Sequence, residues 1–327
     1  LDGRHFPPDK RGTGAKFAYV FYVTSETYLC YALANFDRLT NRLSTGPYSA
    51  KKAIDLALVV MEGVNTTGFC LDACFGPRLK ITLVPPPPKI TTNERYRNSY
   101  VRFEAFKLVQ YERVVIMDGD GVVVKNMDHL FDIDLEGHPA AAAYTPVLNK
   151  WLDSVLLVVE PSLQLYNRVN RYLNANAIRE VAAFANGPHF DMDIINLVFR
   201  RGEGVKLLPK WYATHDHQFN EGVLKRKTDW HKVFYLHFTS EKPWRHWERR
   251  LWPQTTNYLQ TLPGGFLYRL LWVEYNKHCG HLSRRATLTL PMIEKEQGFY
   301  YPDPDEMIDF LKNSSDYLIK APRPDGI

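Results

Sequence analysis

The segment Val114-Val115-Ile116-Met117-Asp118-Gly119-Asp120 decides the fold of this chain. Its four apolar residues predict a short buried strand, and two acidic residues follow where that strand ends. Carboxylates one residue apart offer hard oxygen ligands to a divalent cation such as Mg²⁺ or Mn²⁺. In an open α/β sheet, ligands bind at this end of the strands. The segment therefore predicts a cation site at a sheet edge, where a cation could bridge a nucleotide diphosphate and Gly119 would allow close backbone approach.

Apolar strands and helical segments alternate on both sides of this motif. We expect further strands at residues 16–23, 55–61, 79–84, 140–144, 154–159 and 233–237. Helices are expected from a cap at Thr24 or Ser25, at 97–109, from Pro161 at its favoured first position, and at 191–199. The alternation predicts an α/β fold with a mostly parallel central sheet flanked by helices.

The domain organisation follows from where this pattern holds. Residues 1–15 read as an N-terminal lead, 16–250 as the catalytic domain, and 251–327 as a helical C-terminal extension packed on the same domain. The lead fits a chain cut after a stem or membrane anchor, and equally an uncut cytosolic tail. No apolar run in the sequence is long enough to span a bilayer.

The composition excludes some partners. The 327 residues carry a net charge of +5, spread thinly and without a long run of Lys or Arg, so we expect no nucleic-acid binding. The four cysteines do not form a zinc pattern, although Cys70 and Cys74 are close enough to be bridged. With the glycosylation sequons at Asn65 and Asn313, they favour a secretory lumen over the cytoplasm.

Three other readings compete for Asp118-Gly119-Asp120. A calcium-binding helix-loop-helix fails, because Val122 and Val123 stand where a ligand and the turn glycine are needed. The loop of an Asp-x-Asp-Gly phosphatase matches Asp118 to Gly121. Such a loop normally lies near the start of its domain and is followed by Thr, whereas here a long segment precedes it and Val122 follows. A solvated structural turn is the third reading.

Several blocks around the motif decide between these readings. In order, they are Ala18–Tyr28, Arg102–Asp120, Asn126–Phe131, Pro161–Asn167 and His237–Trp244. Together they resemble glycosyltransferase family 8, the glycogenin-like enzymes of the GT-A fold, over about residues 16–247. The sequences of two segments, Tyr28–Cys30 and Phe190–Asn196, are most similar to those of fungal Golgi members related to N-acetylglucosaminyltransferases.

The resemblance implies a connected site. Asp118, Asp120 and His237 would be the metal ligands, although His237 taken alone would read as a core histidine. Lys242 would pair with the diphosphate as a point charge. Nucleotide-sugar contacts would come from Thr24, Ser25, Tyr28, Arg102, Asp118, Gly119, Asp153 and Ser154. Asp191, with Asp193 as a second candidate, would orient the donor sugar; both could instead be helix N-terminal carboxylates favoured by the dipole.

Two positions depart from the family pattern. Relatives carry Asn-Ser-Gly where this chain has Asp153-Ser154-Val155. Glycogenin has Asp-Gln in the sugar pocket, where this chain has Asp191-Met192, and a thioether cannot replace the two hydrogen-bonding groups of Gln. The donor sugar is therefore not restricted to glucose by this pocket pattern.

The function implied is retaining sugar transfer, dependent on Mn²⁺ or Mg²⁺. The donor would be UDP-GlcNAc, UDP-glucose or UDP-galactose, and the acceptor a glycan or protein. The alternatives are an Asp-nucleophile phosphatase and a catalytically silent UDP-binding member of the family. The expected location is the Golgi lumen, as a type II membrane protein with its anchor removed, or else the cytoplasm. The acceptor, the linkage and the oligomeric state do not follow from the sequence.

Overall fold

The computed structural model describes residues 14–43, 53–89, 94–145, 151–174, 178–185, 190–215 and 232–239. The described residues up to Thr214, together with 234–237, form one compact unit, and the few other described residues, at 215, 232–233 and 238–239, are assigned to a second. Nearly all of the described residues belong to the first unit. Residues 1–13 of the lead predicted at 1–15, and the whole extension at 251–327, lie outside the described residues, so both segments stay predictions.

The first unit is built on a seven-stranded sheet with the order β3-β2-β1-β4-β7-β6-β8. Strands β3, β2, β1 and β4 are parallel, while β7 runs antiparallel to both β4 and β6, and β6 pairs in parallel with β8. The strands are β1 (Phe17–Val23), β2 (Ile54–Met61), β3 (Leu79–Val84), β4 (Arg113–Met117), β6 (Ala140–Tyr144), β7 (Leu152–Val159) and β8 (Lys206–Leu208).

A second, three-stranded sheet has the order β5-β10-β9. It consists of β5 (Gly121–Val123), β9 (Thr214–His215) and β10 (Tyr235–His237). β5 follows the Asp118–Asp120 segment directly and pairs antiparallel with β10, so that His237 stands opposite Gly121. This pairing brings the late strand back to the end of β4.

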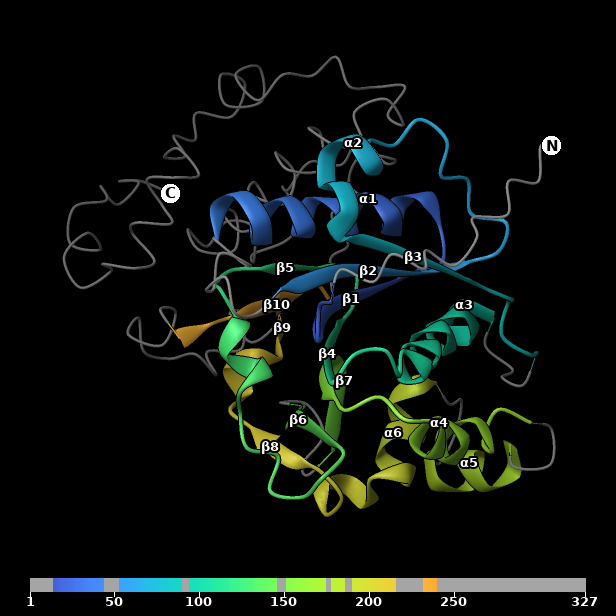
Figure 1. The fold of residues 1–327 in the computed structure, drawn as a ribbon. Coiled ribbons are helices and arrows are strands. Elements are labelled where there is room, and N and C mark those ends of the chain that lie inside the picture. The colour runs from blue at the N-terminus through green and yellow to red at the C-terminus, as the bar shows by residue number, and fades with distance from the viewer. Residues whose placement is uncertain are drawn as a thin grey trace, which may run out of the picture. The chain divides into compact units, whose positions relative to one another are not determined.

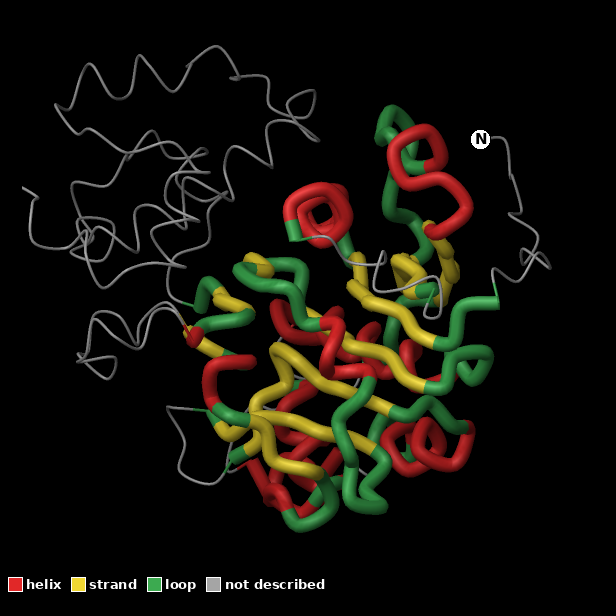
Figure 2. The backbone as a smooth tube through the Cα atoms, turned by 60° about the vertical axis from the view of Figure 1, so that its left-hand side comes forward, coloured by secondary structure: helices red, strands yellow, loops and turns green. Residues whose placement is uncertain are grey.

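Helices cover both faces of the large sheet, with α1 and α2 on one side and α3 to α6 on the other (Figure 1). Figure 2 shows the strands running side by side between them. The α-helices are α1 (Glu26–Asp37), α2 (Asp72–Phe75), α3 (Glu94–Arg97), α4 (Leu163–Asn170), α5 (Ile178–Ala185) and α6 (Asp191–Val198). A π-helical segment, η1 (Arg38–Arg42), extends α1, and 3-10 helices form η2 (Gly76–Arg78), η3 (Asn98–Lys107), η4 (Asp128–Phe131), η5 (Arg200–Gly202) and η6 (Lys210–Tyr212).

Two hydrophobic cores lie on opposite faces of the sheet. Successive side chains of a strand point to opposite faces, so β1 contributes Val20 and Tyr22 to one core and Tyr19 and Phe21 to the other. Every residue of β1 is buried, as expected of a parallel strand covered on both sides. The same alternation carries past β4 and turns Asp118 toward the face covered by η3.

The structure corrects two of the expected helices. Pro161 is not the first helical residue: Ser162 caps α4 by accepting a hydrogen bond from the Leu165 backbone N–H at 3.1 Å, and the helix begins at Leu163. The hydroxyl that caps the helix thus outweighs the positional preference of proline. Residues 97–109 do not form one regular helix either, since a single α turn passes into the 3-10 helix η3. The cap at Ser25 is as expected.

Among the residues that the structure describes, no helix combines the length and apolar character needed to cross a membrane. Cys70 and Cys74 are bridged by a disulfide, with their Cα atoms 5.4 Å apart. This resolves the pairing that the sequence left open.

Candidate functional site

Three potential metal ligands meet at the carboxyl end of β4. The His237 Nε2 atom lies 2.9 Å from Asp120 Oδ1 and 3.6 Å from Asp118 Oδ2. One ligand atom from each of the three residues falls within 4.8 Å of the others. All three side chains are buried. Two carboxylates and an imidazole converging in this way form a donor set suited to Mn²⁺ or Mg²⁺.

The position of His237 depends on α1 through β5. The Asn35 side chain, fully buried on α1, accepts a hydrogen bond from the Val123 backbone N–H at 2.8 Å and donates one to the Gly121 carbonyl at 2.9 Å. These bonds fix β5 against the helix. β5 in turn pairs with β10, whose last residue is His237.

Both glycines of the Asp118–Gly121 segment allow close packing. A Cβ atom on Gly119 would lie 2.8 Å from Cδ1 of Tyr28, and one on Gly121 would lie 2.7 Å from the Leu236 carbonyl and overlap the Tyr235 hydroxyl. That hydroxyl donates a hydrogen bond to the Asp118 carbonyl. Side chains at either position would push the acidic segment away from α1 or β10.

Tyr28 lies beside the acidic pair. Its hydroxyl donates to Asp120 Oδ2 at 3.3 Å, and its ring packs on Gly119. Ser25 caps α1, its hydroxyl accepting the Tyr28 backbone N–H at 3.4 Å, and Thr24 precedes it in a half-buried turn. The expected nucleotide-binding turn is therefore adjacent to the acidic pair, and its contact with a nucleotide stays a prediction.

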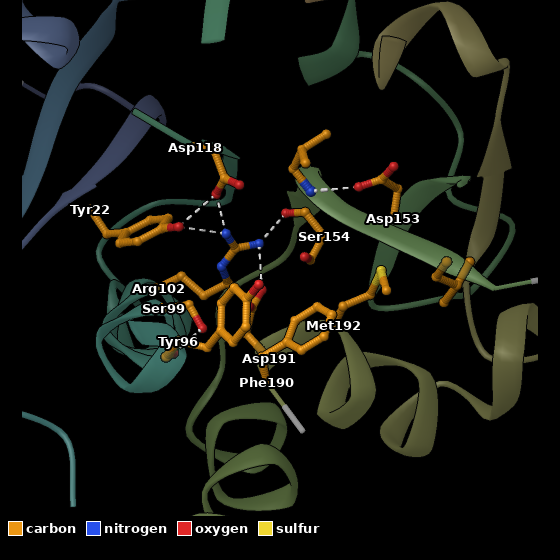
Figure 3. Close-up of polar contacts among 12 residues, drawn as sticks. Tyr22, Tyr96, Ser99, Arg102, Asp118, Asp153, Ser154, Phe190, Asp191 and Met192 are labelled. Carbon is orange, nitrogen blue, oxygen red and sulfur yellow. Dashed lines mark hydrogen bonds and ion pairs between the residues drawn. The ribbon is translucent and has the colours of Figure 1, made fainter. Parts of the chain in front are cut away.

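Arg102 is the centre of a buried polar network (Figure 3). Its Nη2 atom pairs with Asp118 Oδ1 and donates to the Tyr22 hydroxyl at 2.7 Å. Its Nη1 atom lies 2.9 Å from Asp191 Oδ2 and donates to the Ser154 carbonyl. The Tyr22 hydroxyl also donates to Asp118 Oδ1 at 2.8 Å. Four separate elements thus converge on one guanidinium.

Asp191 and Asp193 stand in the first turn of α6. The Asp193 Oδ2 atom accepts the Phe190 backbone N–H at 2.9 Å, which closes the helix N-terminus. Asn196 ties α6 to β7, because its side chain accepts the Leu152 N–H at 2.8 Å and donates to the Leu152 carbonyl at 2.9 Å. Asp191 points at the site, whereas Asp193 serves the helix, as the dipole reading allowed.

Asp153 and Ser154 follow Leu152 at the start of β7, next to the Arg102 network. Asp118 donates its backbone N–H to the Val155 carbonyl at 3.0 Å, which sets β7 beside the acidic segment. Asp153 is buried and accepts the Val155 N–H at 3.0 Å. Ser154 reaches the network through its backbone carbonyl. Figure 3 shows Met192 on the same side of the site as these two residues.

Burial dominates the electrostatics of the site. It raises the pKa of Asp118, an effect that Arg102 opposes and that Asp120 and Asp191 reinforce. For Arg102, burial would lower the pKa, but Asp118 and Asp191 outweigh it and the pKa is raised above its usual range. Burial also raises the pKa of Tyr22. The network therefore holds Tyr22 as a neutral donor and Arg102 as a permanent cation.

Most of the residues singled out from the sequence lie in this site. Asp118, Asp120 and His237 meet at its cation end, Arg102 and Asp191 form the network, and Tyr28, Gly119, Asp153 and Ser154 border it. Lys242 lies outside the described residues. His215, at the end of β9, is buried, with its Nδ1 atom 2.5 Å from the Thr239 hydroxyl.

Sequence reasoning missed Tyr22 and Tyr235, which hold the side chain and the carbonyl of Asp118. The signal for Tyr22 was a hydroxyl near the carboxyl end of a buried strand, at the sheet edge where the acidic pair was expected. Phe21 pairs with Met117, so Tyr22 stands level with Asp118. Tyr235 carried no such signal, because only the pairing of β10 with β5 brings it here.

Comparisons with known proteins bear on what this site does. Residues 88–188, about a third of the chain, match the model of a family described as Glycosyl transferase family 8. Two fungal relatives are both named Glucose N-acetyltransferase 1. The protein of Gibberella zeae is 23% identical over 70% of this chain and 53% of its own length. That of Aspergillus fumigatus is 26% identical over 56% and 49%. The chain thus spans about half the length of these relatives.

Among solved structures, the galactosyltransferase LgtC in complex with donor and acceptor sugar analogs is similar, with a TM-score of 0.52. The alignment covers 78% of this chain and 95% of that one at 12% identity. At this identity the likeness shows a shared fold alone. It confirms the GT-A fold class expected from the sequence.

Proposed function

We propose that this chain, which belongs to glycosyltransferase family 8, transfers a sugar from a nucleotide-sugar donor to an acceptor with the help of a divalent cation. The observation that carries the proposal is the convergence of Asp118, Asp120 and His237 at the carboxyl end of β4. In α/β sheets of this kind, that edge is where ligands bind.

The charges of the network support a divalent ion. Asp118, Asp120 and Asp191, when ionised, carry three negative charges and Arg102 one positive charge, which leaves −2. Arg102 contacts Asp118 and Asp191, and His237 links Asp118 to Asp120. His237 is in contact with both cation-end carboxylates. A doubly charged cation would balance the cluster and would favour ionised Asp118 over the protonated form that burial promotes.

The reaction proposed is transfer from a UDP-sugar to a glycan or protein hydroxyl. A bound Mn²⁺ or Mg²⁺ would neutralise the charge that develops on the departing diphosphate. Lys242 would add a second positive charge on that group. Arg102 and Asp191 would orient the donor sugar, with the Arg102 fork held by Asp118, Tyr22 and the Ser154 carbonyl. Family membership further suggests retention of configuration, with the acceptor attacking on the face that the diphosphate leaves.

The donor is proposed to be UDP-GlcNAc, UDP-glucose or UDP-galactose. Met192, half-buried beside Asp191, offers a thioether to this side of the site. The family match leaves the Asp-nucleophile phosphatase without support. It does not distinguish an active enzyme from a silent UDP-binding member, so the test must separate binding from turnover.

The binding test is a thermal-shift titration of the purified chain with MnCl₂ and UDP. A ligand that binds only the native state adds about 2.7 kcal/mol of stability at a hundred times its Kd, so Mn²⁺ with UDP should raise Tm by several degrees. Asp120→Asn and His237→Ala should remove most of this rise. Glu203→Gln, which neutralises an exposed acid on another surface, should keep it.

An Asp120→Asn chain that keeps the full Mn²⁺-dependent shift would refute the cation site. Turnover is then measured as UDP release from each of the three UDP-sugars. Asp191→Asn should reduce the rate at least tenfold while leaving the UDP and Mn²⁺ shift in place. Binding without release from any donor would identify a silent member, and near-normal turnover of Asp191→Asn would exclude the role proposed for Asp191.

A further inference from the structure

The loop between β2 and α2 carries the triplet Asn65-Thr66-Thr67. Its residues 62–70 lie outside helices and strands. The Asn65 side chain is exposed, and its Oδ1 atom accepts the Thr67 backbone N–H at 3.0 Å. We propose that Asn65 is an N-glycosylation site and that the chain therefore passes through a secretory lumen.

The conformation of the loop keeps Asn65 at the surface. Gly63 and Gly68 both have positive φ values, 90° and 88°, and bend the chain on either side of the triplet. A Cβ atom on Gly63 would meet no atom within 4 Å, so open space surrounds the start of the loop. Val64 and Phe69 pack against the core next to α1 and anchor the two ends. Within the triplet, Asn65 and Thr67 are exposed and Thr66 is half-buried.

The triplet meets the chemical requirements of the modification. The Asn65 Nδ2 atom forms a bond to C1 of the first sugar of a lipid-pyrophosphate-linked oligosaccharide. The C1–O bond to phosphate breaks, the lipid pyrophosphate leaves, and Nδ2 gives up one proton. The sequon requires a hydroxyl two residues on, which Thr67 supplies, and a residue other than proline between them, which Thr66 is.

The disulfide next to the loop gives independent support for the compartment. Cys70 and Cys74 are bridged, and both residues are exposed to solvent. An exposed bridge is accessible to small thiols, so it persists only where the surroundings are oxidising. Secretory lumens meet this condition, and they are also where N-linked oligosaccharides are attached. The bridge and the sequon lie within ten residues of each other in the sequence, and both require the same environment.

The test is expression of the full chain through the secretory pathway of yeast, followed by peptide mass analysis. Release with peptide-N-glycosidase in ¹⁸O-labelled water marks each formerly glycosylated Asn as labelled Asp. The Asn65 peptide should carry the label, and Thr67→Ala should remove it. Thr66→Ala and Thr67→Ser keep the sequon and should keep the label. Reading the Asn65 peptide alone separates it from the sequon at Asn313, which lies outside the described residues.

An unlabelled Asn65 peptide from secreted, disulfide-bonded chain, beside a labelled reporter glycoprotein from the same cells, would overturn the proposal. If Thr67→Ala is not secreted, Asn65→Gln provides a second variant, and the wild-type peptide still decides the question. Neither result depends on sugar-transfer activity, so the outcome is independent of the function proposed above.

Discussion

At the scale of single residues, Arg102 determines how the site can hold its charge. A guanidinium buried this deeply is stable only with close ionic partners, and it has two, Asp118 and Asp191. The same residue therefore joins the end of β4 to the start of α6. Its removal would leave the buried carboxylates of Asp118 and Asp191 without their cation, in a site that also contains Asp120.

Replacing Arg102 tests this role in stability. Arg102→Met leaves Asp118 and Asp191 without their buried cation, and loss of one partner from a buried pair costs about 3–5 kcal/mol. Lys107→Met breaks the half-exposed pair with Glu104, where the expected cost is about 0–1 kcal/mol. Urea denaturation of both variants gives the two free energies of unfolding. Equal losses would show that the buried ion pairs of Arg102 stabilise the fold no more than the half-exposed pair of Lys107 and Glu104.

Asp193 makes a prediction about pH. Burial raises its pKa to about 6, although the Phe190 N–H opposes this. A group with a raised folded-state pKa stabilises the native state below its unfolded pKa, about 3.9, and that contribution is lost as pH rises through 6. Asp193→Asn, whose amide oxygen can still accept the Phe190 N–H, should gain stability relative to wild type between pH 4 and 7. Parallel denaturation curves across this range, with a constant difference, would contradict the prediction.

At the scale of elements, the β5–β10 pair places the imidazole. The two strands are far apart in sequence, as the separation of 117 positions between Asp120 and His237 shows. Gly121 allows them to approach, since its Cα faces the Tyr235 hydroxyl and the Leu236 carbonyl. The cation end of the site therefore depends on this close approach as much as on its ligands.

Gly121→Ala tests that dependence. The added methyl group would lie 2.7 Å from the Leu236 carbonyl, so the strands must separate at an expected cost of about 1–3 kcal/mol. His237 should shift, and the Mn²⁺-dependent rise in Tm should shrink. Gly204→Ala is the matched control, because its Cβ would meet Phe199 at 3.4 Å, an ordinary contact. A Gly121→Ala chain as stable and as responsive to Mn²⁺ as Gly204→Ala would refute the argument.

The sequence predicted those elements whose signal is local. The apolar runs of β1 and β3 and the cap at Ser25 lie where they were expected, because periodicity and capping act over a few residues. Pro161 misled, since a competing cap one residue later determined the helix start. β5 has only three residues and exists through its pairing with β10, so no local pattern could identify it.

The residues of the site also divide into those with a local sequence signal and those placed only by long-range contacts. Asp118 and Asp120 were recognisable from their own segment, and His237 only from its resemblance to a family block. The contacts that hold them were not accessible from sequence. Tyr22 meets Arg102 across 80 positions, and Asn35 meets Val123 across 88. Such contacts follow from strand register and helix packing, which a single sequence does not specify.

At the scale of the whole molecule, the sheet order ranks the stability of the strands. β1 and β4 lie inside the seven-stranded sheet, pair on both sides and are covered by a core on each face. β3 pairs only with β2 among the described residues, and its Leu83 side chain is exposed. The cation site therefore lies at the end of an interior strand, β4, that is covered on both faces.

This ranking predicts the pattern of amide hydrogen exchange. Amides of β1 and β4 should exchange only through global unfolding, whereas those of β3 should exchange through local opening of the edge, at least tenfold faster. Exchange followed by peptide mass analysis, without added cation, measures both. Mild urea should accelerate β1 and β4 together and leave β3 little changed, because local opening exposes little new surface. If β3 is as protected as β1, another segment must cover the edge, and the ranking of the strands by their position in the sheet would be wrong.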